Sequence, residues 1–219
     1  MTTVDIVGGP ERLVVGLEPH DELWAAAFVT HRARIRAAIE AAAPDALVAV
    51  EHIGSTAVPG LAAKPIVDIV VVVEDITAEE DYLTPLLAAG YTLRVREPAH
   101  RLVRTPARDV HVHLLERGDP AIDDYLLLRD HLRTDAADRA LYEQTKRALL
   151  ARPWDDMNAY ADAKTEVIAA IKARARAERA ARAASSATPR RSPVHGAPAS
   201  SPPTPASPPA PSSNATASP

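Results

Sequence analysis

The residues best suited to chemistry lie in the segment 51–73, which reads EHIGSTAVPGLAAKPIVDIVVVV. Gly54 would permit a sharp turn and the close approach of a ligand, and the amides after it, with the hydroxyls of Ser55 and Thr56, could hold phosphate oxygens. Asp68 stands in an otherwise apolar strand, where a carboxylate is costly unless it is paired, hydrogen-bonded or metal-bound. We expect a phosphate-binding turn beside a catalytic or metal-binding Asp68; the alternative is a Gly-Ser turn anchored by Asp68.

Two histidines on a later strand could join this carboxylate. Strand alternation over residues 110–115 places His111 and His113 on one face, and His52 stands two residues before Gly54. One aspartate with two or three imidazoles suits a pair of Mg²⁺ ions poorly, since Mg²⁺ prefers oxygen ligands, but it suits one Zn²⁺ or Mn²⁺ ion. We expect a divalent ion on Asp68, His111 and His113, with His52 as a further candidate. The alternative is polar histidines on a half-exposed face, or histidines that bind phosphate directly.

Basic residues near this segment are candidates for binding phosphate. Lys64 precedes the Asp68 strand, and Arg101 and Arg104 lie on a strand that we expect beside the histidine strand. Arg129, on a later helix, is a candidate either for the site or for bracing the sheet. An isolated surface cation is usually only solvated, so the expectation depends on these residues meeting around the turn.

Two later helices repeat a tyrosine followed four residues on by a lysine. The pairs are Tyr142 with Lys146 and Tyr160 with Lys164. We interpret both as core packing in which the lysine carries its charge outward to solvent.

The periodicity of the chain predicts the elements that must position these residues. β-Branched runs indicate strands at 47–53 and 65–73, and three shorter strands are expected at 91–97, 101–105 and 110–115. Helices are expected at 21–42, 77–89, 119–133, 135–151 and 155–183, with Thr77 and Glu80 forming a capping box and Asp119-Pro120 opening the third helix. This order predicts an α/β (α+β) domain in which one mixed sheet is flanked by helices and followed by a helical C-terminal part.

Composition limits the class of protein. The chain of 219 residues has a formal net charge of −4, whereas a dedicated nucleic-acid binder usually carries a basic surplus. Its lack of cysteine excludes a disulfide scaffold, a thiolate zinc site and a cysteine nucleophile. Apolar runs such as 69–73 are far too short to span a bilayer, and the first residues do not resemble a secretory signal. We expect a cytoplasmic protein without membrane contact.

The chain divides by composition into three parts. Residues 189–219 contain ten prolines and no leucine, isoleucine or aromatic residue, so they cannot bury enough apolar surface to offset the entropy lost on ordering. We expect a flexible N-terminus over 1–13, one domain over 14–183 and a disordered proline-rich tail over 184–219.

The run HIGSTAVPGLAAKPIVDI resembles the signature of the GrpB family, which is associated with dephospho-CoA kinase. The likeness continues through Leu17–Ile35 and through the region around Arg101, His111 and His113. It also includes Arg129-Asp130 and the two tyrosine–lysine pairs, so it covers most of residues 14–183 and leaves the tail outside.

The resemblance implies a nucleotidyltransferase-like fold, because the GrpB family is grouped with that superfamily. Active members place a Gly-Ser after one strand and an acidic pair on the next, and Gly54, Ser55 and Asp68 match that layout. The position two after Asp68 is Val70, and the later strand expected to carry a third acid instead carries His111 and His113. The missing acids favour a module that binds a nucleotide or another phosphate-bearing metabolite.

Three other functions stay open. The first is an active nucleotidyl or phosphoryl transferase that uses Asp68 and a divalent metal ion. The second is a non-catalytic accessory domain that works with dephospho-CoA kinase. The third is a structural domain without a small ligand. The glycine, serine, lysine, aspartate and histidines retained in the motif argue against this third function.

Overall fold

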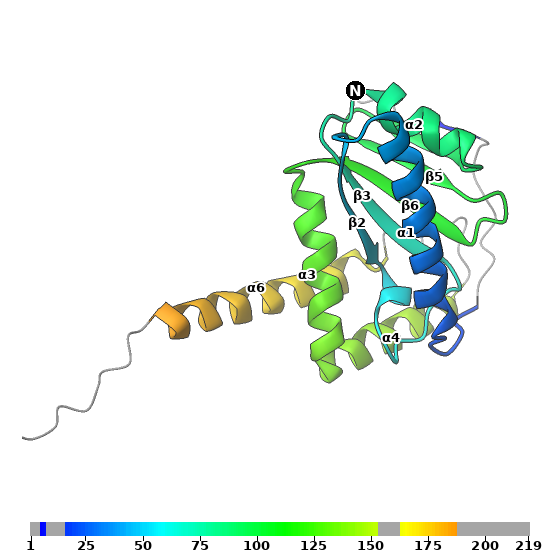
Figure 1. The fold of residues 1–219 in the computed structure, drawn as a ribbon. Coiled ribbons are helices and arrows are strands. Elements are labelled where there is room, and N and C mark those ends of the chain that lie inside the picture. The colour runs from blue at the N-terminus through cyan, green and yellow to red at the C-terminus, as the bar shows by residue number, and fades with distance from the viewer. Residues whose placement is uncertain (1–4, 8–15, 153–162, 188–219) are drawn as a thin grey trace, which may run out of the picture.

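A computed structural model describes residues 5–7, 16–152 and 163–187, and there the chain forms one mixed sheet with helices on both faces (Figure 1). The strands are β1 (Asp5–Ile6), β2 (Leu47–Ile53), β3 (Val67–Val73), β4 (Thr92–Glu97), β5 (His100–Arg104) and β6 (Val110–Glu116). The helices are α1 (Leu23–Ala42), α2 (Glu79–Ala88), α3 (Pro120–Thr134), α4 (Ala136–Leu150) and α6 (Thr165–Ala187), with a 3₁₀ turn, η1 (Ser55–Ala57). The α/β prediction is therefore confirmed.

The sheet order is β1-β4-β5-β6-β3-β2. β2 and β3 are antiparallel neighbours, which confirms the prediction that the two apolar runs of the motif lie side by side. β3 and β6 are parallel, and their register sets Asp68 beside His111. Since residues paired directly across two strands point to the same face, this register brings the predicted carboxylate and imidazoles together.

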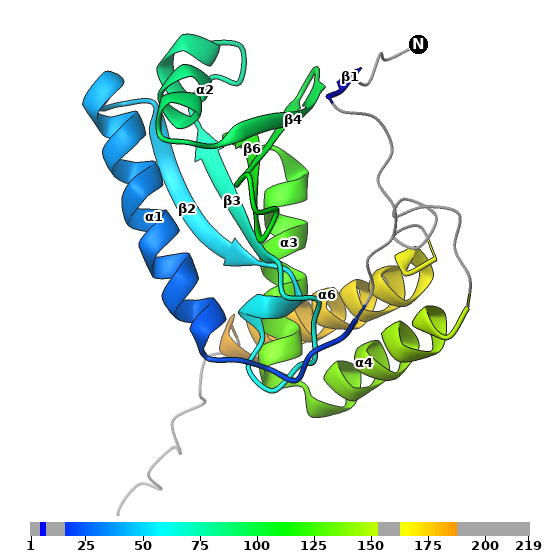
Figure 2. The ribbon, with the colours of Figure 1, turned by 90° about the vertical axis from the view of Figure 1, so that its right-hand side faces the viewer.

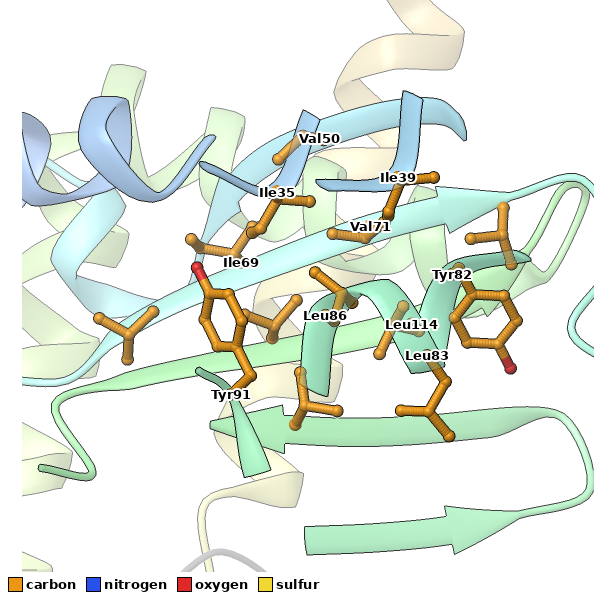
Figure 3. Packing of buried hydrophobic residues seen from close by; sticks show 14 of the residues in the cluster. Ile35, Ile39, Val50, Ile69, Val71, Tyr82, Leu83, Leu86, Tyr91 and Leu114 are labelled. Carbon is orange, nitrogen blue, oxygen red and sulfur yellow. The ribbon is translucent and has the colours of Figure 1, made fainter. Parts of the chain in front are cut away.

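Helices α1 and α2 cover one face of the sheet. Ile35 and Ile39 of α1 are fully buried one turn apart and pack with Ile69 and Val71 of β3, while Leu86 of α2 joins the same cluster (Figure 3). The alternate residues of β3 are buried as well, as expected for a central strand covered on both faces. This packing makes β3 a rigid support for Asp68.

Helix α3 covers the other face. Ile53 of β2, Val70 of β3 and Leu115 of β6 form a smaller cluster against Tyr125 and Leu126 of α3. Strand alternation places Asp68 and the two histidines of β6 on this same face, next to the α3 cluster. The candidate site thus lies on the α3 face of the sheet.

A third cluster joins the helices to the connection between β2 and β3. Val58 and Leu61 of that connection are fully buried against Leu132 of α3, Tyr142 of α4 and Ile171 of α6. Figures 1 and 2 show α4 and α6 at the end of the sheet where η1 lies. The helical C-terminal part therefore holds the Gly-Ser turn in place.

Two of the predicted helices begin at an aspartate that caps them, and a third lacks the capping box that was predicted for it. Asp119 accepts a hydrogen bond from the Ala121 amide, and Asp135 accepts one from the Asp138 amide. The predicted capping box at Thr77 is wrong, because the cap position is Ala78 and the hydroxyl of Thr77 donates to Asp75 instead. The local turn formed by the Asp75 carboxylate takes the place of the box.

The ends of the chain differ from the expected domain limits. Asp5 and Ile6, expected in a flexible N-terminus, pair with β4, and residues 184–187, expected in the tail, continue α6. The rest of the predicted tail, 188–219, and the first part of the predicted last helix, 155–162, lie outside the described residues. Among the residues that are described, no helix is long and apolar enough to cross a membrane.

Candidate functional site

The Asp68 carboxylate lies against the backbone of Gly54. The two strands are antiparallel and Ile53, the last residue of β2, pairs with Asp68, so the next residue of the chain passes directly over the carboxylate. Gly54 has φ +72° and ψ −171°, a region of backbone conformation that essentially only glycine adopts. A Cβ atom on this residue would lie 2.6 Å from Asp68 Oδ2. The glycine is therefore required both by the turn and by the carboxylate.

Both predicted histidines face the same carboxylate oxygen. His111 Nδ1 lies 3.6 Å and His113 Nε2 lies 3.9 Å from Asp68 Oδ1. Each of the three side chains is 20–31% exposed, so solvent or a ligand can reach them. The convergence that the sequence predicted is found, at distances longer than a direct hydrogen bond.

A third histidine extends the group. His100 Nε2 lies 3.2 Å from His113 Nδ1, and the two rings are stacked with centroids 5.4 Å apart. The other ring nitrogen of His100 lies 2.8 Å from Glu97 Oε2. Tyr125 of α3 packs against His113, with ring centroids 5.9 Å apart, and burial raises the pKa of its hydroxyl. We call Asp68, His111, His113 and His100 the Asp68 site.

The other side of the Gly54 turn is met by a lysine from α4. Lys146 Nζ donates to Ser55 Oγ at 3.2 Å and to the carbonyl of Ala62, and it also lies 4.9 Å from the centre of the Tyr142 ring. Lys146 is only 2% exposed. Its charge is thus held inside the protein, directly at the predicted phosphate-binding serine.

Two more lysines share this environment. Burial lowers the pKa of Lys146 to about 7 and that of Lys64 to about 8. In both cases the positive charge of Lys164 is the second cause that lowers the pKa. Burial also lowers the pKa of Lys164, while the charge of Asp68 opposes that shift. The charge of Lys164 thus acts on both other lysines, and the charge of Asp68 acts on Lys164. We call Lys64, Lys146 and Lys164 the lysine cluster.

The family model described as GrpB protein matches residues 14–174, and these residues contain the Gly54 turn, the Asp68 site and the lysine cluster. The chain belongs to the GrpB family. A UPF0157 protein of Streptomyces coelicolor is 66% identical over 82% of this chain and 94% of its own length.

The fold agrees with a solved member of the same family. The crystal structure of conserved protein GrpB from Enterococcus faecalis has a TM-score of 0.61 and 29% sequence identity, over 73% of this chain and 96% of that one. A dephospho-CoA kinase of Mycolicibacterium paratuberculosis is 32% identical over 75% of this chain but only 46% of its own length. That relative is thus about twice as long as the part that resembles this GrpB chain.

Two predicted site residues of the GrpB chain instead hold the turn together. His52 Nε2 donates to Thr56 Oγ1 at 3.1 Å, and that hydroxyl donates to the carbonyl of Ile66 at 3.1 Å. His52 also stacks on Phe28 of α1, on the face opposite Asp68, and burial lowers its pKa to about 4. The side chains of His52 and Thr56 are therefore occupied in fixing the Gly54 turn, and the structure does not bring them to the Asp68 site.

The predicted arginines divide between the two faces of the sheet. Arg101 lies on the α1 and α2 face, where its Nε donates to Glu79 at 2.6 Å and its side chain is 8% exposed. Arg104 pairs in register with His111 and so lies on the site face. The expectation that both arginines surround the turn is wrong for Arg101, because positions three apart on a strand point to opposite faces.

Arg129 fastens α3 to β2. Its Nη1 donates to Glu51 Oε2 at 2.7 Å and to the carbonyl of His52 at 3.1 Å, while its Nε donates to Asp130. The side chain is 11% exposed. The hydrogen bonds to Glu51 and His52 connect α3 to β2, so the structure supports the bracing role for this arginine.

The donor set of the Asp68 site fits one ion better than two. A pair of Mg²⁺ ions needs several carboxylates, but Val70, where a second acid would stand, is fully buried in the α3 cluster. One carboxylate oxygen with imidazole nitrogens is a donor set for Zn²⁺, Mn²⁺ or a similar ion. In the described residues, the one group of three whose ligand atoms all lie within 4.8 Å of one another is elsewhere: His131, Asp135 and Asp138.

Sequence reasoning missed three residues of this region. Lys146 and Lys164 were interpreted as core residues with solvated charges, although the structure buries Lys146 beside Ser55. His100 was not considered, although it stands one residue before the predicted strand and has the same alternation as Arg104. The recurrence of a lysine four residues after a tyrosine on two helices was the available signal for the lysines.

Proposed function

We propose that this GrpB-family chain binds a phosphate-bearing small molecule at the Gly54 turn, with a nucleotide as the first candidate. The observation that carries the proposal is the buried Lys146, whose ammonium donates to Ser55 Oγ in the turn, with the half-buried Lys64 and Lys164 completing the lysine cluster. The carboxylates of Asp68 and Glu143 offset part of this positive charge, and a bound anion would offset more of it. A phosphate group is the anion that lysines, free amides and a serine hydroxyl bind well.

Each part of the turn has a role in this proposal. Gly54 leaves the backbone open to the ligand, and Lys146 with Ser55 supplies two donors on one side. Lys64 and Lys164 add charge, and Arg104 lies near His111 on the same face as Asp68. The order of a Gly-Ser turn and a carboxylate on the next strand is the layout that the nucleotidyltransferase resemblance implies, and it supports a nucleotide over a simple phosphate ester.

Calorimetric titration of the purified chain tests the proposal. We expect nucleoside triphosphates to bind and the corresponding nucleosides not to bind. Lys146→Met should weaken binding of the triphosphate at least tenfold, because it removes one buried cation from the site. Arg147→Met is the matched control, since Arg147 is the next residue on α4 but is 55% exposed and pairs with Glu143. Equal affinities of triphosphate and nucleoside, or equal losses in the two variants, would refute the proposal.

A second candidate is an active nucleotidyl or phosphoryl transferase. It is favoured by the position of Asp68 directly against the turn and opposite two imidazoles. A divalent ion on Asp68, His111 and His113 would stabilise negative charge on the transferred phosphate. Turnover of labelled nucleoside triphosphates that depends on a divalent ion and disappears in Asp68→Asn would establish this activity. If the chain binds nucleotide but shows no turnover over a panel of ions and acceptors, only the binding function is supported.

A third candidate is an accessory domain for dephospho-CoA kinase in the cytoplasm. It is favoured by the two relatives of that name, in which the matching part is 46% and 43% of the protein. Dephospho-CoA itself carries a pyrophosphate, which the lysine cluster could hold. Analytical ultracentrifugation of this chain with the dephospho-CoA kinase of the same organism, with and without dephospho-CoA, tests the partnership. Two independent sedimenting species under both conditions would exclude it.

A further inference from the structure

A pocket between α3 and α6 is lined by none of the residues of the Gly54 turn, the Asp68 site or the lysine cluster. Figure 1 shows α6 crossing α3 and continuing past it. The pocket has a volume of about 480 Å³, within the range of small-molecule sites. Its apolar lining is supplied by Leu126, Leu127 and Ala175. The rest of the lining is polar or charged, so a ligand of mixed character is expected there.

The buried histidine of this pocket is held in one orientation from behind. The side chain of His131 is 5% exposed, and its Nε2 lies 2.7 Å from Asp138 Oδ2. Asp138 accepts two further hydrogen bonds from Arg174, which lower the pKa of its carboxyl group. Since an ionised carboxylate only accepts hydrogen bonds, the proton of His131 lies on Nε2. Asp138, on α4, is thus a positioning residue for His131.

The other ring nitrogen of His131 lies beside a second acceptor. His131 Nδ1 is 3.7 Å from Glu178 Oε2, which is too long for a hydrogen bond. In the neutral ring this nitrogen carries a lone pair, so it and the carboxylate are two acceptors that face each other. Among the described side chains, Glu178 has only one further contact, at 3.5 Å with the exposed Arg182. A nitrogen donor about 2.9 Å from both acceptors would satisfy them together.

We propose that this pocket binds a free aliphatic α-amino acid, whose ammonium group lies between His131 Nδ1 and Glu178. An ammonium group has three donors and no acceptor, and so complements two facing acceptors. Arg179, the next residue of α6, also lines the pocket, and among the described residues it has no hydrogen-bond or ion-pair partner. Because a guanidinium group binds a carboxylate well, we assign the carboxylate of the amino acid to Arg179. The proposal does not depend on binding of a phosphate ligand.

The charges around the pocket favour an amino acid over ligands that carry one charge. The carboxylates of Asp123 and Asp130 also line it, so a purely anionic ligand would meet like charge, which costs free energy. A simple amine would leave Arg179 without a partner. A metal ion held through Asp138 would have to displace the ion pair with Arg174. A ligand with both an ammonium and a carboxylate group avoids all three costs, and its apolar side chain would lie on the apolar lining.

Calorimetric titration of the full-length chain with L-leucine tests the proposal. Three analogues each lack one charge of leucine: isocaproate has no ammonium group, isoamylamine has no carboxylate, and leucinamide has an amide in its place, as a peptide does. We expect leucine to bind, and each analogue to bind at least about tenfold more weakly. Absence of leucine binding, or equal affinities for leucine and isocaproate, would overturn the proposal. Equal affinities for leucine and leucinamide would overturn the assignment of a free amino acid.

Substitutions on α6 separate the two ends of the ligand. Glu178→Gln should weaken leucine binding at least about tenfold, because it removes the charge that faces the ammonium group. Glu166→Gln is the matched control, since Glu166 lies on the same helix, is exposed and does not line the pocket. Arg179→Met should weaken binding of leucine and leave that of leucinamide unchanged. Equal losses of leucine affinity in Glu178→Gln and Glu166→Gln would overturn the proposal.

Nitrogen chemical shifts of the His131 ring give a direct check that needs no substitution. We expect Nδ1 to be unprotonated in the ligand-free chain and its chemical shift to change when leucine is added. A ring that is protonated on both nitrogens and does not respond to leucine would itself be the donor to Glu178, and would overturn the proposal. Lys146→Met should leave leucine binding unchanged, so a failure of the phosphate proposal and a failure of this one remain distinguishable.

Discussion

Gly54 and Asp68 are so close that a methyl group on the glycine would lie 2.6 Å from Asp68 Oδ2. The contact joins the end of β2 to the start of β3, which are antiparallel neighbours. The turn that would bind phosphate and the carboxylate that would bind a metal ion are therefore parts of one rigid unit.

We expect Gly54→Ala to disrupt this unit more than the matched change Gly60→Ala. Both glycines have a positive φ, +72° and +75°, so alanine is strained at both positions, by about 1–3 kcal/mol. Only at Gly54 would the new Cβ also displace a carboxylate, because nothing lies within 4 Å of a Cβ at Gly60. Thermal unfolding of the two variants measures the difference. A melting temperature that falls equally in both would show that the Asp68 contact has no energetic consequence.

The stability of the chain should rise with pH between about 7.5 and 9.5. The pKa of Lys146 is about 7 in the folded chain, against 10.5 for an ordinary lysine, so in this interval the unfolded chain binds more protons. The cost of burying the charge is complete below pH 7 and is relieved as pH rises, by up to ~1.4 kcal/mol per pH unit. Urea unfolding over this range measures the slope. Lys64, whose pKa is lowered to about 8, contributes over the same range, so Lys146→Met should reduce the slope without abolishing it. A slope that stays unchanged in that variant would show that Lys146 does not contribute to it.

Binding of sulfate should draw protons from solution at pH 8. Sulfate does not titrate near this pH, and its charge raises the pKa of Lys64 and Lys146 from about 8 and about 7. Calorimetry in two buffers of different ionisation enthalpy measures the uptake. The affinity for sulfate should accordingly fall as pH is raised from 7 to 9. Release of protons, or tighter binding at higher pH, would mean that the lysine cluster does not contact the anion.

Arg129→Met should destabilise the fold without weakening binding of a phosphate ligand. The substitution leaves Glu51 and the carbonyl of His52 without their donor, which we expect to cost about 1–3 kcal/mol. Arg36→Met is the control, since Arg36 pairs with Glu40 on the exposed face of α1, where such pairs contribute about 0.3–0.5 kcal/mol. Chemical unfolding and calorimetric titration of both variants test this. A loss of ligand affinity in Arg129→Met with an unchanged unfolding free energy would place Arg129 in the site.

The strands, and the meeting of His111 and His113 with Asp68, could be predicted because they depend on the residue pattern within single strands. β2 begins and ends at the residues expected from its β-branched run, and α3 begins after the expected Asp119 cap. Alternation alone placed His111 and His113 on one face, and the structure finds both at Asp68. The same rule also excludes Arg101 as a partner of Arg104, because the two positions are three apart on one strand.

The lysine cluster could not be predicted in the same way. A lysine one turn after a tyrosine has the same spacing whether its charge is solvated or buried. Which of the two applies to Lys146 depends on α4 packing against the β2–β3 connection, where Val58 and Leu61 meet Tyr142. That contact is tertiary, and it cannot be predicted from the sequence of α4 alone.

The hydrogen bond between Lys146 and Ser55 spans 91 residues of the chain, and this separation sets an order of events during synthesis. The six strands of the described sheet precede α4 and α6 in the chain, so they leave the ribosome before Lys146 and Lys164 do. Pairing over so long a separation is also among the slower steps of folding. A nascent chain would thus acquire its carboxylate and imidazoles first, and would acquire Lys146 and Lys164, two members of the lysine cluster, only near the completion of the domain.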